Sequence, residues 1–235
     1  INAFGGEGGE FIMGGAPVNP EIEKWFQKIR LPYTVGYGMT EATPLLAYAG
    51  SAEYVAGSCG KPVDCATVRI DSDDPQHIVG EIQAKGDNIC LGYYKNPEAS
   101  ANAFTDDGFL RTGDLGLFDA DGNLYIKGRS KSMILSANGQ NIYPEEVEAV
   151  VNSQPYVQES VVVDRSARLV ALVYLDQEAL RKDGLDQETI ADLPERIRIN
   201  SDKQLPNYSQ ITKVEIVDQP FEKTPKMSIK RFLYK

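Results

Sequence analysis

A chain of 235 residues, of which 42% are hydrophobic and 25% charged, has the composition of an ordinary globular protein and the length of one large domain or two smaller ones. This composition excludes a chain that is disordered throughout. The formal net charge of −10 opposes binding to phosphate backbones, so we expect no nucleic-acid partner.

The cysteines and the single histidine bound the chemistry further. Cys59, Cys65 and Cys90 have neither C-x-x-C spacing nor a clustered histidine, which argues against a zinc site and a disulfide framework. His77 lies in an expected turn, and we interpret it as structural. Apolar runs such as 169–175 are too short for a membrane span, and no positively charged, apolar leader precedes them. We therefore expect a cytoplasmic protein without a transmembrane segment, which still allows peripheral contact with a membrane.

The first elements predict a parallel α/β arrangement. EFIMGG (10–15) is typical of a short strand, PVNPEIEKWFQKIR (17–30) of a helix, and LPYTVGYG (31–38) of the next strand. Loops that follow parallel strands are where such folds bind ligands. The chain begins INAFGG without Met, so we expect it to be part of a longer protein. One apolar face of the predicted helix carries Ile22, Trp25, Phe26 and Ile29.

From about residue 51 to 127 the pattern changes to short strands separated by Gly, Asp and Pro. Three of these strand segments are TVRIDS, VGEIQAKG and LGLFDADGNLYIKG, the last of which contains the hairpin signal DADGN. We expect a small β-barrel-like subdomain here.

After Gly128 the pattern predicts a compact α+β unit. The expected domains are the end of an α/β domain (1–50), the small β subdomain (51–128) and the α+β unit (129–235). The charged stretch KGRSKS (127–132) is the expected boundary and a candidate hinge. The third domain comprises a hairpin at SMILSANGQNI, a helix from Pro144, strands at 156–163 and 168–175, helices at 176–183 and 186–204, and a strand at 211–218.

The loop GYGMTEATP (36–44) combines an aromatic ring, a hydroxyl and a carboxylate after a predicted strand. Tyr37 could stack on a purine, Thr40 could donate to a phosphate oxygen, and Glu41 could hold a magnesium ion that bridges phosphates. The alternative is a tight turn in which Thr40 caps a helix.

Asp114 in RTGDLGLF and Arg129 in KGRSKS are candidates for contacts with a sugar or a phosphate. A carboxylate is an acceptor suited to a ribose diol, and a guanidinium is a rigid fork suited to ribose or phosphate oxygens. Each signal is weak by itself, because an isolated Asp is more often part of a turn and an isolated Arg is more often an exposed hairpin charge.

The C-terminal tail, EKTPKMSIKRFLYK (222–235), carries five basic residues and one acidic residue. Removing its charge of +4 from the total of −10 leaves −14 on residues 1–221. Either the tail is a solvated or nucleic-acid-seeking terminus, or it reaches a polyanion held elsewhere on the same protein.

Together these segments form an ordered set. The order MGGAP, GYGMTE, GEIQAKGDNICLGYYKNPE, FLRTGD, GRSKSMILSANGQNIYPEEVE and KTPKMSIKR resembles the adenylate-forming superfamily, the acyl-CoA synthetases and their relatives. The resemblance runs from about residue 10 to the C-terminus. GGAP, GYGMTE and NGQNIYPEEVE are most similar to bacterial long-chain fatty acid-CoA ligases. The implied fold is the end of an α/β adenylation domain, a small β subdomain and a C-terminal α+β lid.

The resemblance implies an ATP- and Mg²⁺-dependent ligase that forms an acyl-adenylate and then passes the acyl group to CoA. Tyr37 would stack on adenine with Gly38 beside it, Thr40 would contact the α-phosphate, and Glu41 would hold magnesium. The backbone of Gly14, Gly15, Ala16 and Pro17 would line the adenine.

Further roles follow for the rest of the chain. Asp114 and Arg129 would grip the ribose of ATP or AMP, Lys131 would be the hinge of the lid, and Gly139 would lie beside the pantetheine tunnel. The family's catalytic lysine would enter from the C-terminal tail.

This sequence departs from the family in that tail, where Ser228 occupies the expected lysine position. Lys226 and Lys230 would flank Ser228 on the same side of an extended segment, so either could supply the ammonium. The alternative is that the tail has lost this function.

The family's Ser/Thr/Gly-rich phosphate loop and most of its acyl pocket would lie upstream of MGGAP, so we expect residues 1–235 alone to be catalytically incompetent and to need the N-terminal part of the same protein. Fatty acid, ATP and CoA are the expected ligands. The competing hypotheses are another adenylate-forming CoA ligase, a carrier-loading enzyme, and a non-catalytic nucleotide-binding protein.

Overall fold

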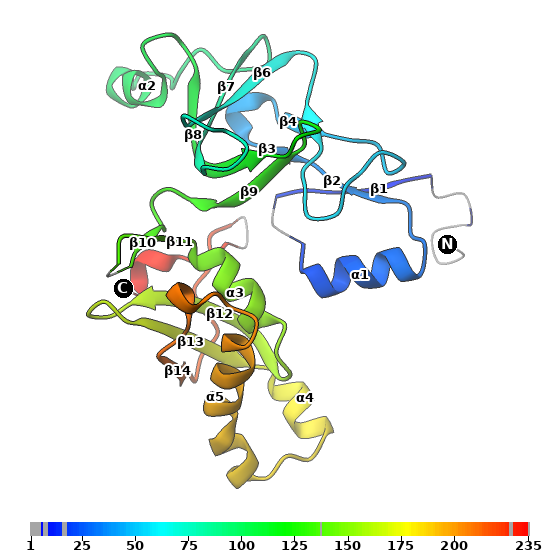
Figure 1. Ribbon diagram of the computed structural model, residues 1–235, viewed down its shortest axis with the longest axis vertical. Coiled ribbons are helices and arrows are strands. Elements are labelled where there is room, and N and C mark those ends of the chain that lie inside the picture. The colour runs from blue at the N-terminus through cyan, green and yellow to red at the C-terminus, as the bar shows by residue number, and fades with distance from the viewer. Residues whose placement is uncertain (1–5, 7–8, 16–17, 137, 226–227, 235) are drawn as a thin grey trace. The chain divides into compact units, whose positions relative to one another are not determined.

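The computed structural model describes residues 6, 9–15, 18–136, 138–225 and 228–234. The chain divides into two compact units, residues 1–131 and residues 132–235 (Figure 1). The division falls between Lys131 and Ser132, inside the charged stretch 127–132.

The first unit begins with the expected strand–helix–strand motif. Strand β1 (Phe11–Met13) pairs in parallel with β2 (Tyr33–Val35), and helix α1 (Pro20–Lys28) connects them. Helix α1 begins where the side chain of Asn19 accepts a hydrogen bond from the backbone N–H of Glu21 at 2.8 Å, with proline at the first helical position. The local sequence therefore sets the start of this helix.

The burial of α1 differs from what its apolar stripe suggests. Trp25 is 56% exposed, and Ile22 and Ile29 are each 47% exposed, whereas Glu23 on the same helix is only 6% exposed. The carboxylate of Glu23 accepts a hydrogen bond from the phenol of Tyr54 at 2.6 Å. Periodicity locates an apolar face, but it does not determine whether another element covers that face.

The middle of this unit consists of two antiparallel sheets, one ordered β3-β4-β5 and one ordered β6-β7-β8-β9. The expected barrel is wrong, because the described strands form open sheets and no ladder closes the four-stranded sheet onto its first strand. The DADGN turn does connect β8 and β9 as a hairpin. The elements are β3 (Tyr37–Gly38), the 3-10 helix η2 (Thr40–Ala42), β4 (Leu45–Tyr48), β5 (Lys61–Pro62), β6 (Ala66–Asp71), β7 (Gly80–Gly86), α2 (Pro97–Ala103), β8 (Leu110–Phe118) and β9 (Leu124–Arg129).

One apolar core joins residues on both sides of the expected boundary at residue 50. Val35 and Leu46 from the first stretch pack in the same cluster as Ile70, Ile82 and Leu124 from the second. The loops that follow β2 and β3 are therefore fixed against the four-stranded sheet, and this sheet carries the other candidate site residues.

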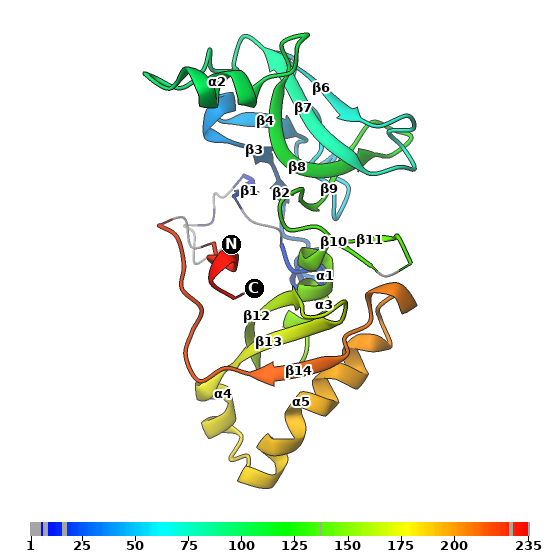
Figure 2. The same cartoon turned by 90° about the vertical axis from the view of Figure 1, so that its left-hand side faces the viewer.

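The second unit is an α+β layer built on a three-stranded sheet ordered β12-β13-β14. Strands β12 and β13 are antiparallel, and β13 and β14 are parallel. Helix α3 packs on β12 and α5 on β14 (Figure 2). The elements are β10 (Ile134–Leu135), β11 (Asn141–Ile142), α3 (Pro144–Asn152), β12 (Val157–Asp164), β13 (Leu169–Leu175), α4 (Gln177–Lys182), α5 (Gln187–Asp202), the 3-10 helix η3 (Asn207–Ser209), β14 (Lys213–Ile216) and the 3-10 helix η4 (Arg231–Leu233).

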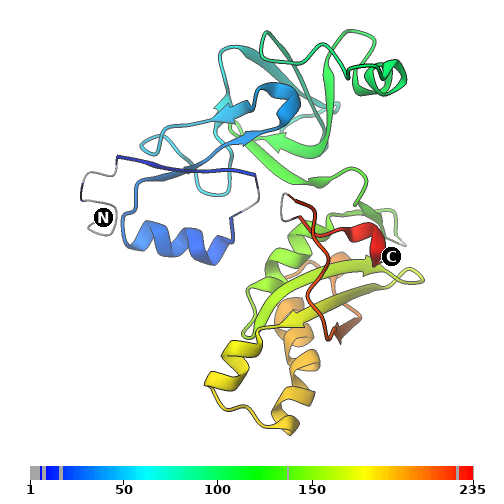
Figure 3. The same cartoon turned by 180° about the vertical axis from the view of Figure 1, so that it is seen from behind.

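Both faces of this sheet are covered. Val162 and Val173 pack with the helices, whereas Val161 and Leu172 on the opposite face pack with Phe221. The C-terminal segment, red in Figure 3, passes over that second face. A strand buried on both faces has a continuous apolar sequence, which explains LVALVYL.

Two further observations concern the cysteines and the length of the helices. Cys59, Cys65 and Cys90 are all free thiols, in agreement with the cysteine spacing. Within the part of the chain that the structure describes, every helix falls short of the length and apolar character needed to cross a membrane.

The core of the second unit gives a first testable prediction. Leu175 is 1% exposed, so Leu175→Ala should lower the free energy of unfolding by about 2–5 kcal/mol through lost transfer energy and the cavity left behind. The same substitution at Leu135, which is 64% exposed, should change that energy by less than about 0.5 kcal/mol. Urea denaturation followed by circular dichroism measures both variants. Similar values for the two would contradict this description of the core.

Candidate functional site

Tyr37, Asp114 and Arg129 form one polar cluster in the first unit, named here the Asp114 cluster. The phenol of Tyr37 donates to Oδ2 of Asp114 at 2.6 Å, and Nε of Arg129 lies 2.8 Å from Oδ1. Asp114 and Arg129 are directly opposite on β8 and β9, so the hairpin register brings them together. Tyr37 and Arg129, which the sequence singled out separately, thus contact the carboxylate of Asp114.

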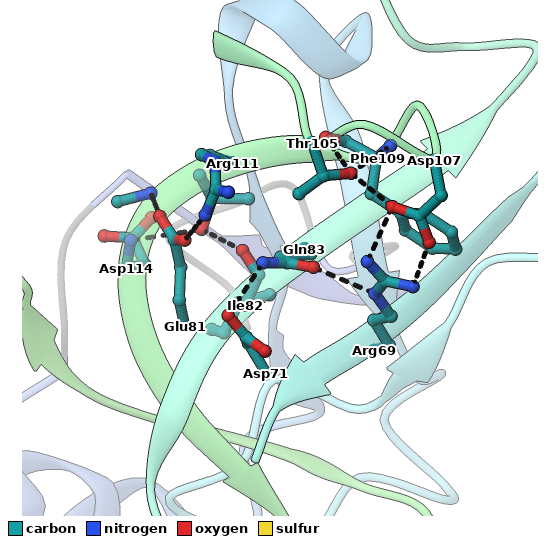
Figure 4. A network of polar contacts seen from close by, with 12 residues as sticks. Arg69, Asp71, Glu81, Ile82, Gln83, Thr105, Asp107, Phe109, Arg111 and Asp114 are labelled. Carbon is teal, nitrogen blue, oxygen red and sulfur yellow. Dashed lines mark hydrogen bonds and ion pairs between the residues drawn. The ribbon is translucent and has the colours of Figure 1, made fainter. Parts of the chain in front are cut away.

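A bulge in β8 orients Asp114. Between the pairs Glu81–Leu115 and Gln83–Arg111, Ile82 alone on β7 faces three residues of β8. Gly113 within this bulge has a φ of 71°, which a residue with a side chain rarely adopts. Figure 4 shows Glu81 reaching this bulge, where its carboxylate accepts from the N–H of Gly113 at 3.2 Å and pairs with Arg111.

The neighbouring polar network on β6 and β7 is structural. Arg69 pairs with Asp107 at 2.6 Å, donates to Gln83 at 2.8 Å and lies 3.8 Å from the centre of the Phe109 ring (Figure 4). The hydrogen bond from Arg69 gives the buried side-chain oxygen of Gln83 a donor, and it connects β6 to β7 next to the bulge.

Burial distinguishes the members of the Asp114 cluster. Asp114 and Tyr37 are 6% and 7% exposed, whereas the guanidinium of Arg129 faces solvent. Burial, and then the charge of Asp114, raise the pKa of the Tyr37 phenol well above its ordinary value. The phenol therefore stays protonated and keeps donating to Asp114. Little of its ring is exposed in this structure, and adenine stacking by Tyr37 stays a prediction.

The loop after β3 carries the other nucleotide candidates. Thr40 is exposed at the start of η2, and Met39 rather than Thr40 occupies the capping position, so the capping alternative is not what the structure has. Glu41 is partly exposed, and its Oε1 accepts a hydrogen bond from the phenol of Tyr93 at 2.9 Å. Gly38 permits the close approach of this loop, because a Cβ there would lie 1.9 Å from the carbonyl oxygen of Pro44.

The glycine-rich segment after β1 is described in part. Gly14 and Gly15 follow β1 directly and are exposed, which leaves their backbone accessible to a ligand. Ala16 and Pro17 lie outside the described residues.

Lys131 and Gly139 belong to different units. Lys131 is the last residue of the first unit and is exposed, and its role as a hinge stays a prediction. Gly139 lies in the turn between β10 and β11 of the second unit, where its N–H donates to the carbonyl of Ser136 at 2.9 Å.

The C-terminal tail folds back on itself as a hairpin. Lys223 and Ile229 form a bridge, and the N–H of Lys230 donates to the carbonyl of Glu222 at 2.8 Å. Lys230 and Ser228 lie on the returning arm, and the ammonium of Lys230 is 3.2 Å from the carboxylate of Glu222. Lys226 lies outside the described residues.

Carboxylates of the second unit itself pair with cations of this tail. Lys223 lies 2.5 Å from Glu159 of β12, and Arg231 pairs with Glu148 and lies 3.6 Å from Glu145 on α3. The described residues of the basic tail are thus held on this unit. Sequence reasoning missed these pairs because the partners are far apart in the chain, 83 residues in the case of Glu148 and Arg231.

Glu148 is the most deeply buried of these partners. Its Oε1 accepts from the backbone N–H of Val162 at 2.6 Å, and Oε2 pairs with Arg231. Both contacts favour the charged form, yet burial outweighs them and raises the pKa of Glu148 from 4.5 to about 7.

The residues present suit a nucleotide-bound magnesium ion better than a resident metal. No group of three His, Cys, Asp or Glu side chains that could hold a metal occurs among the described residues. Oε2 of Glu41 has no hydrogen-bond partner within that part of the chain, so one carboxylate oxygen is available. Mg²⁺ in nucleotide sites is bound through one or two carboxylates plus substrate phosphates, which fits a single Glu41.

The described residues thus combine a mixed α/β fold with a carboxylate–arginine pair that Tyr37 connects to β3. The chain matches the AMP-binding enzyme family over residues 9–94 and the AMP-binding enzyme C-terminal domain over residues 131–234. It belongs to this adenylate-forming family.

Curated relatives are CoA ligases with different acids. The chain is 35% identical to the long-chain-fatty-acid–CoA ligase FadD15 of Mycobacterium bovis over 178 residues, which cover 75% of this chain and 28% of that protein. It is 40% identical to the 2-succinylbenzoate–CoA ligase of Bacillus cytotoxicus over 162 residues, 66% of this chain and 33% of that protein.

The fold also matches solved structures of O-succinylbenzoate CoA synthetase (MenE) from Bacillus subtilis. The complex with AMP aligns with a TM-score of 0.81 and 26% identity, over 97% of this chain and 46% of that chain. The complex with ATP and magnesium ion aligns with a TM-score of 0.78 and 27% identity, over 95% and 46%. The chain therefore spans less than half the length of these proteins.

The buried Glu148 predicts a pH dependence of stability. Because its pKa is raised on folding, the folded state keeps a proton that the unfolded state releases above pH 4.5, so rising pH favours unfolding up to about pH 7. The free energy of unfolding should therefore fall across this range relative to that of Glu148→Gln. Denaturation of both proteins at several pH values measures the difference.

Glu178→Gln is the matched control, because Glu178 is exposed in the same unit. Its stability should run parallel to that of the unsubstituted protein across the same range. A parallel curve for Glu148→Gln as well would contradict the raised pKa.

Proposed function

We propose that this chain supplies the ribose-binding and lid parts of an ATP-dependent acyl-CoA ligase whose acid is a long-chain fatty acid. In the first half-reaction the carboxylate attacks the α-phosphorus of ATP, giving acyl-adenylate and pyrophosphate. In the second, the CoA thiol attacks the acyl carbon and AMP leaves. The Asp114 cluster is the observation that carries this proposal.

The cluster suits a ribose diol on chemical grounds. Asp114 is held as an acceptor between a phenol and a guanidinium, and Arg129 presents an exposed fork of donors at the edge of β9. A ribose hydroxyl pair would donate to the carboxylate and accept from the guanidinium. The same contacts would serve ATP and AMP, so the nucleotide stays bound through both half-reactions.

The loop after β3 would bind the phosphates. Thr40 offers an exposed hydroxyl to the α-phosphate, and Glu41 offers a carboxylate for the metal. When bound, Mg²⁺ offsets the negative charge of the phosphates. The loop is fixed against the four-stranded sheet, which supports positioning as its main contribution.

The second unit would act as the lid. Lys131, at the boundary of the two units, would be its hinge, and Gly139 would lie beside the incoming pantetheine arm of CoA. A lid that serves both half-reactions brings a lysine ammonium to the phosphates during adenylation and removes it before the thiol enters.

Lys226 is the lysine we assign to adenylation. The ammonium of Lys230 is already paired with Glu222, and its backbone closes the hairpin, so its withdrawal would disturb the tail. Lys226 stands two residues before Ser228 in the sequence. The assignment rests on the ion pair and the backbone hydrogen bond of Lys230, which Lys230 would have to break to reach the phosphates.

The identity of the carboxylic acid substrate rests on the similar proteins. Similarity to FadD15 supports a long-chain fatty acid, and the higher identity of 40% to 2-succinylbenzoate–CoA ligase supports an aromatic dicarboxylic acid as the second candidate. A carrier-loading enzyme and a non-catalytic nucleotide-binding protein remain the further alternatives.

A product assay on the full open reading frame that contains this chain tests the function. We expect AMP and acyl-CoA from palmitate with ATP, Mg²⁺ and CoA, and little product from acetate or 2-succinylbenzoate. Asp114→Asn should weaken AMP binding measured by titration calorimetry by about 10-fold or more, because a charge-assisted acceptor is lost.

Each alternative has its own result in this assay. Thioester from 2-succinylbenzoate alone would select the second candidate, and acyl transfer to a carrier protein but not to CoA would select a loading enzyme. AMP binding without product from any acid would select the non-catalytic protein.

The lysine assignment is tested with single variants of the same protein. Lys226→Ala should reduce acyl-adenylate formation by about 100-fold or more, since charge stabilisation in the transition state is lost. Lys230→Ala is the matched control and should keep most of that rate.

Thioester formation from supplied acyl-adenylate and CoA should survive in both variants, which separates a catalytic defect from misfolding. Loss of adenylation in Lys230→Ala instead would move the role to that residue. Unchanged adenylation in both variants would mean that the tail lacks this function.

A further inference from the structure

Residues 88–93 are hydrogen-bonded to the loop that carries Thr40 and Glu41. The amide of Asn88 donates to the carbonyls of Ala42 at 3.0 Å and Leu45 at 2.8 Å, and the hydroxyl of Thr43 donates back to the Asn88 carbonyl at 2.7 Å. The N–H of Cys90 donates to the Glu41 carbonyl at 2.8 Å. The backbone on which Glu41 stands is therefore held by a segment distant in sequence.

The same segment also reaches the side chain of Glu41, through Tyr93. The phenol donates to Oε1 at 2.9 Å. A tyrosine phenol is protonated at neutral pH, so it can serve as the donor to this carboxylate.

The backbone of Tyr93 is fixed as well. Its N–H donates to Oγ of Ser100 in α2 at 2.8 Å, and a Cβ at Gly92 would lie 2.8 Å from that same oxygen. Asn96 caps α2 by accepting from the N–H of Ala99 at 3.0 Å. Hydrogen bonds to α2, a helix with a capped N-terminus, thus restrain the backbone of Tyr93.

Folding alone gives little reason for this contact. Tyr93 is 41% exposed and Glu41 is partly exposed, so a hydrogen bond between them adds little to stability. It does fix one oxygen of the carboxylate and leaves Oε2 available. Tyr94, the next residue, is 89% exposed, and Nζ of Lys95 lies 5.3 Å from the centre of its ring.

We propose that Tyr93 is a positioning residue, whose phenol holds the Glu41 carboxylate in one orientation for a divalent cation that arrives with the nucleotide phosphates. The inference rests on the proposed function, in which Glu41 contacts that cation. A metal-binding side chain whose rotation is restricted loses less entropy on binding, and partners of metal ligands typically contribute 10- to 100-fold in affinity.

The test measures Mn²⁺ binding by electron paramagnetic resonance to the full protein, in the presence of a non-hydrolysable ATP analogue. Tyr93→Phe should raise the Mn²⁺ dissociation constant by about 10-fold, at the lower end of that range. Tyr94→Phe is the matched control and should leave it unchanged. AMP binding without metal should be equal in all three proteins.

Three results would overturn the inference, each for a different reason. Normal Mn²⁺ binding in Tyr93→Phe, with binding lost in Glu41→Gln, would leave the proposed function standing without a role for Tyr93. Normal binding in Glu41→Gln would remove Glu41 from the metal site and the proposal with it. Weaker AMP binding together with a lower melting temperature in Tyr93→Phe would assign the contact to folding.

Discussion

The buried charge of Asp114 is the constraint on which the candidate site depends. A carboxylate removed from water is costly unless donors surround it, and here Tyr37 and Arg129 provide them from two other strands. Those contacts are available only because β8 bulges at Gly113 and β9 returns in register. The requirement to satisfy one charge therefore links β3, the bulge and the end of the hairpin in a single arrangement.

In the second unit the charges that need partners are the cations of the C-terminal tail. Its tail is basic within a chain of net charge −10, and Glu159, Glu148 and Glu222 pair with its cations. These pairs hold the hairpin arms over the sheet face that Phe221 covers. The ion pairs of Lys223 and Arg231 fix the described parts of the tail on the second unit, which suits the positioning role proposed for this tail.

Local sequence determined most elements and several of the site's residues. A proline in the first turn marks the starts of both α1 and α3, the Asn19 cap adds to the start of α1, and the DADGN turn set the β8–β9 hairpin. Barrel closure was beyond prediction, because strand patterns carry no information on which edges pair. Glu23 and Tyr93 were missed because their partners lie on other elements, and a polar residue's role depends on contacts that periodicity does not encode.

The distribution of candidate residues over the two units has a chemical consequence for the proposed reaction. Residues assigned to the nucleotide lie in residues 1–131, whereas the candidate lysines lie in residues 132–235. Adenylation needs positive charge near the phosphates, and thioester formation needs that charge absent so that a thiol can enter. The proposed ribose contacts, Asp114 and Arg129, and the candidate lysines belong to separate units. A hinge movement at Lys131 would therefore change the charge near the phosphates and leave the Asp114 cluster intact. AMP would then keep its proposed contacts with the Asp114 cluster in both half-reactions, while the charge around its phosphate differs between them.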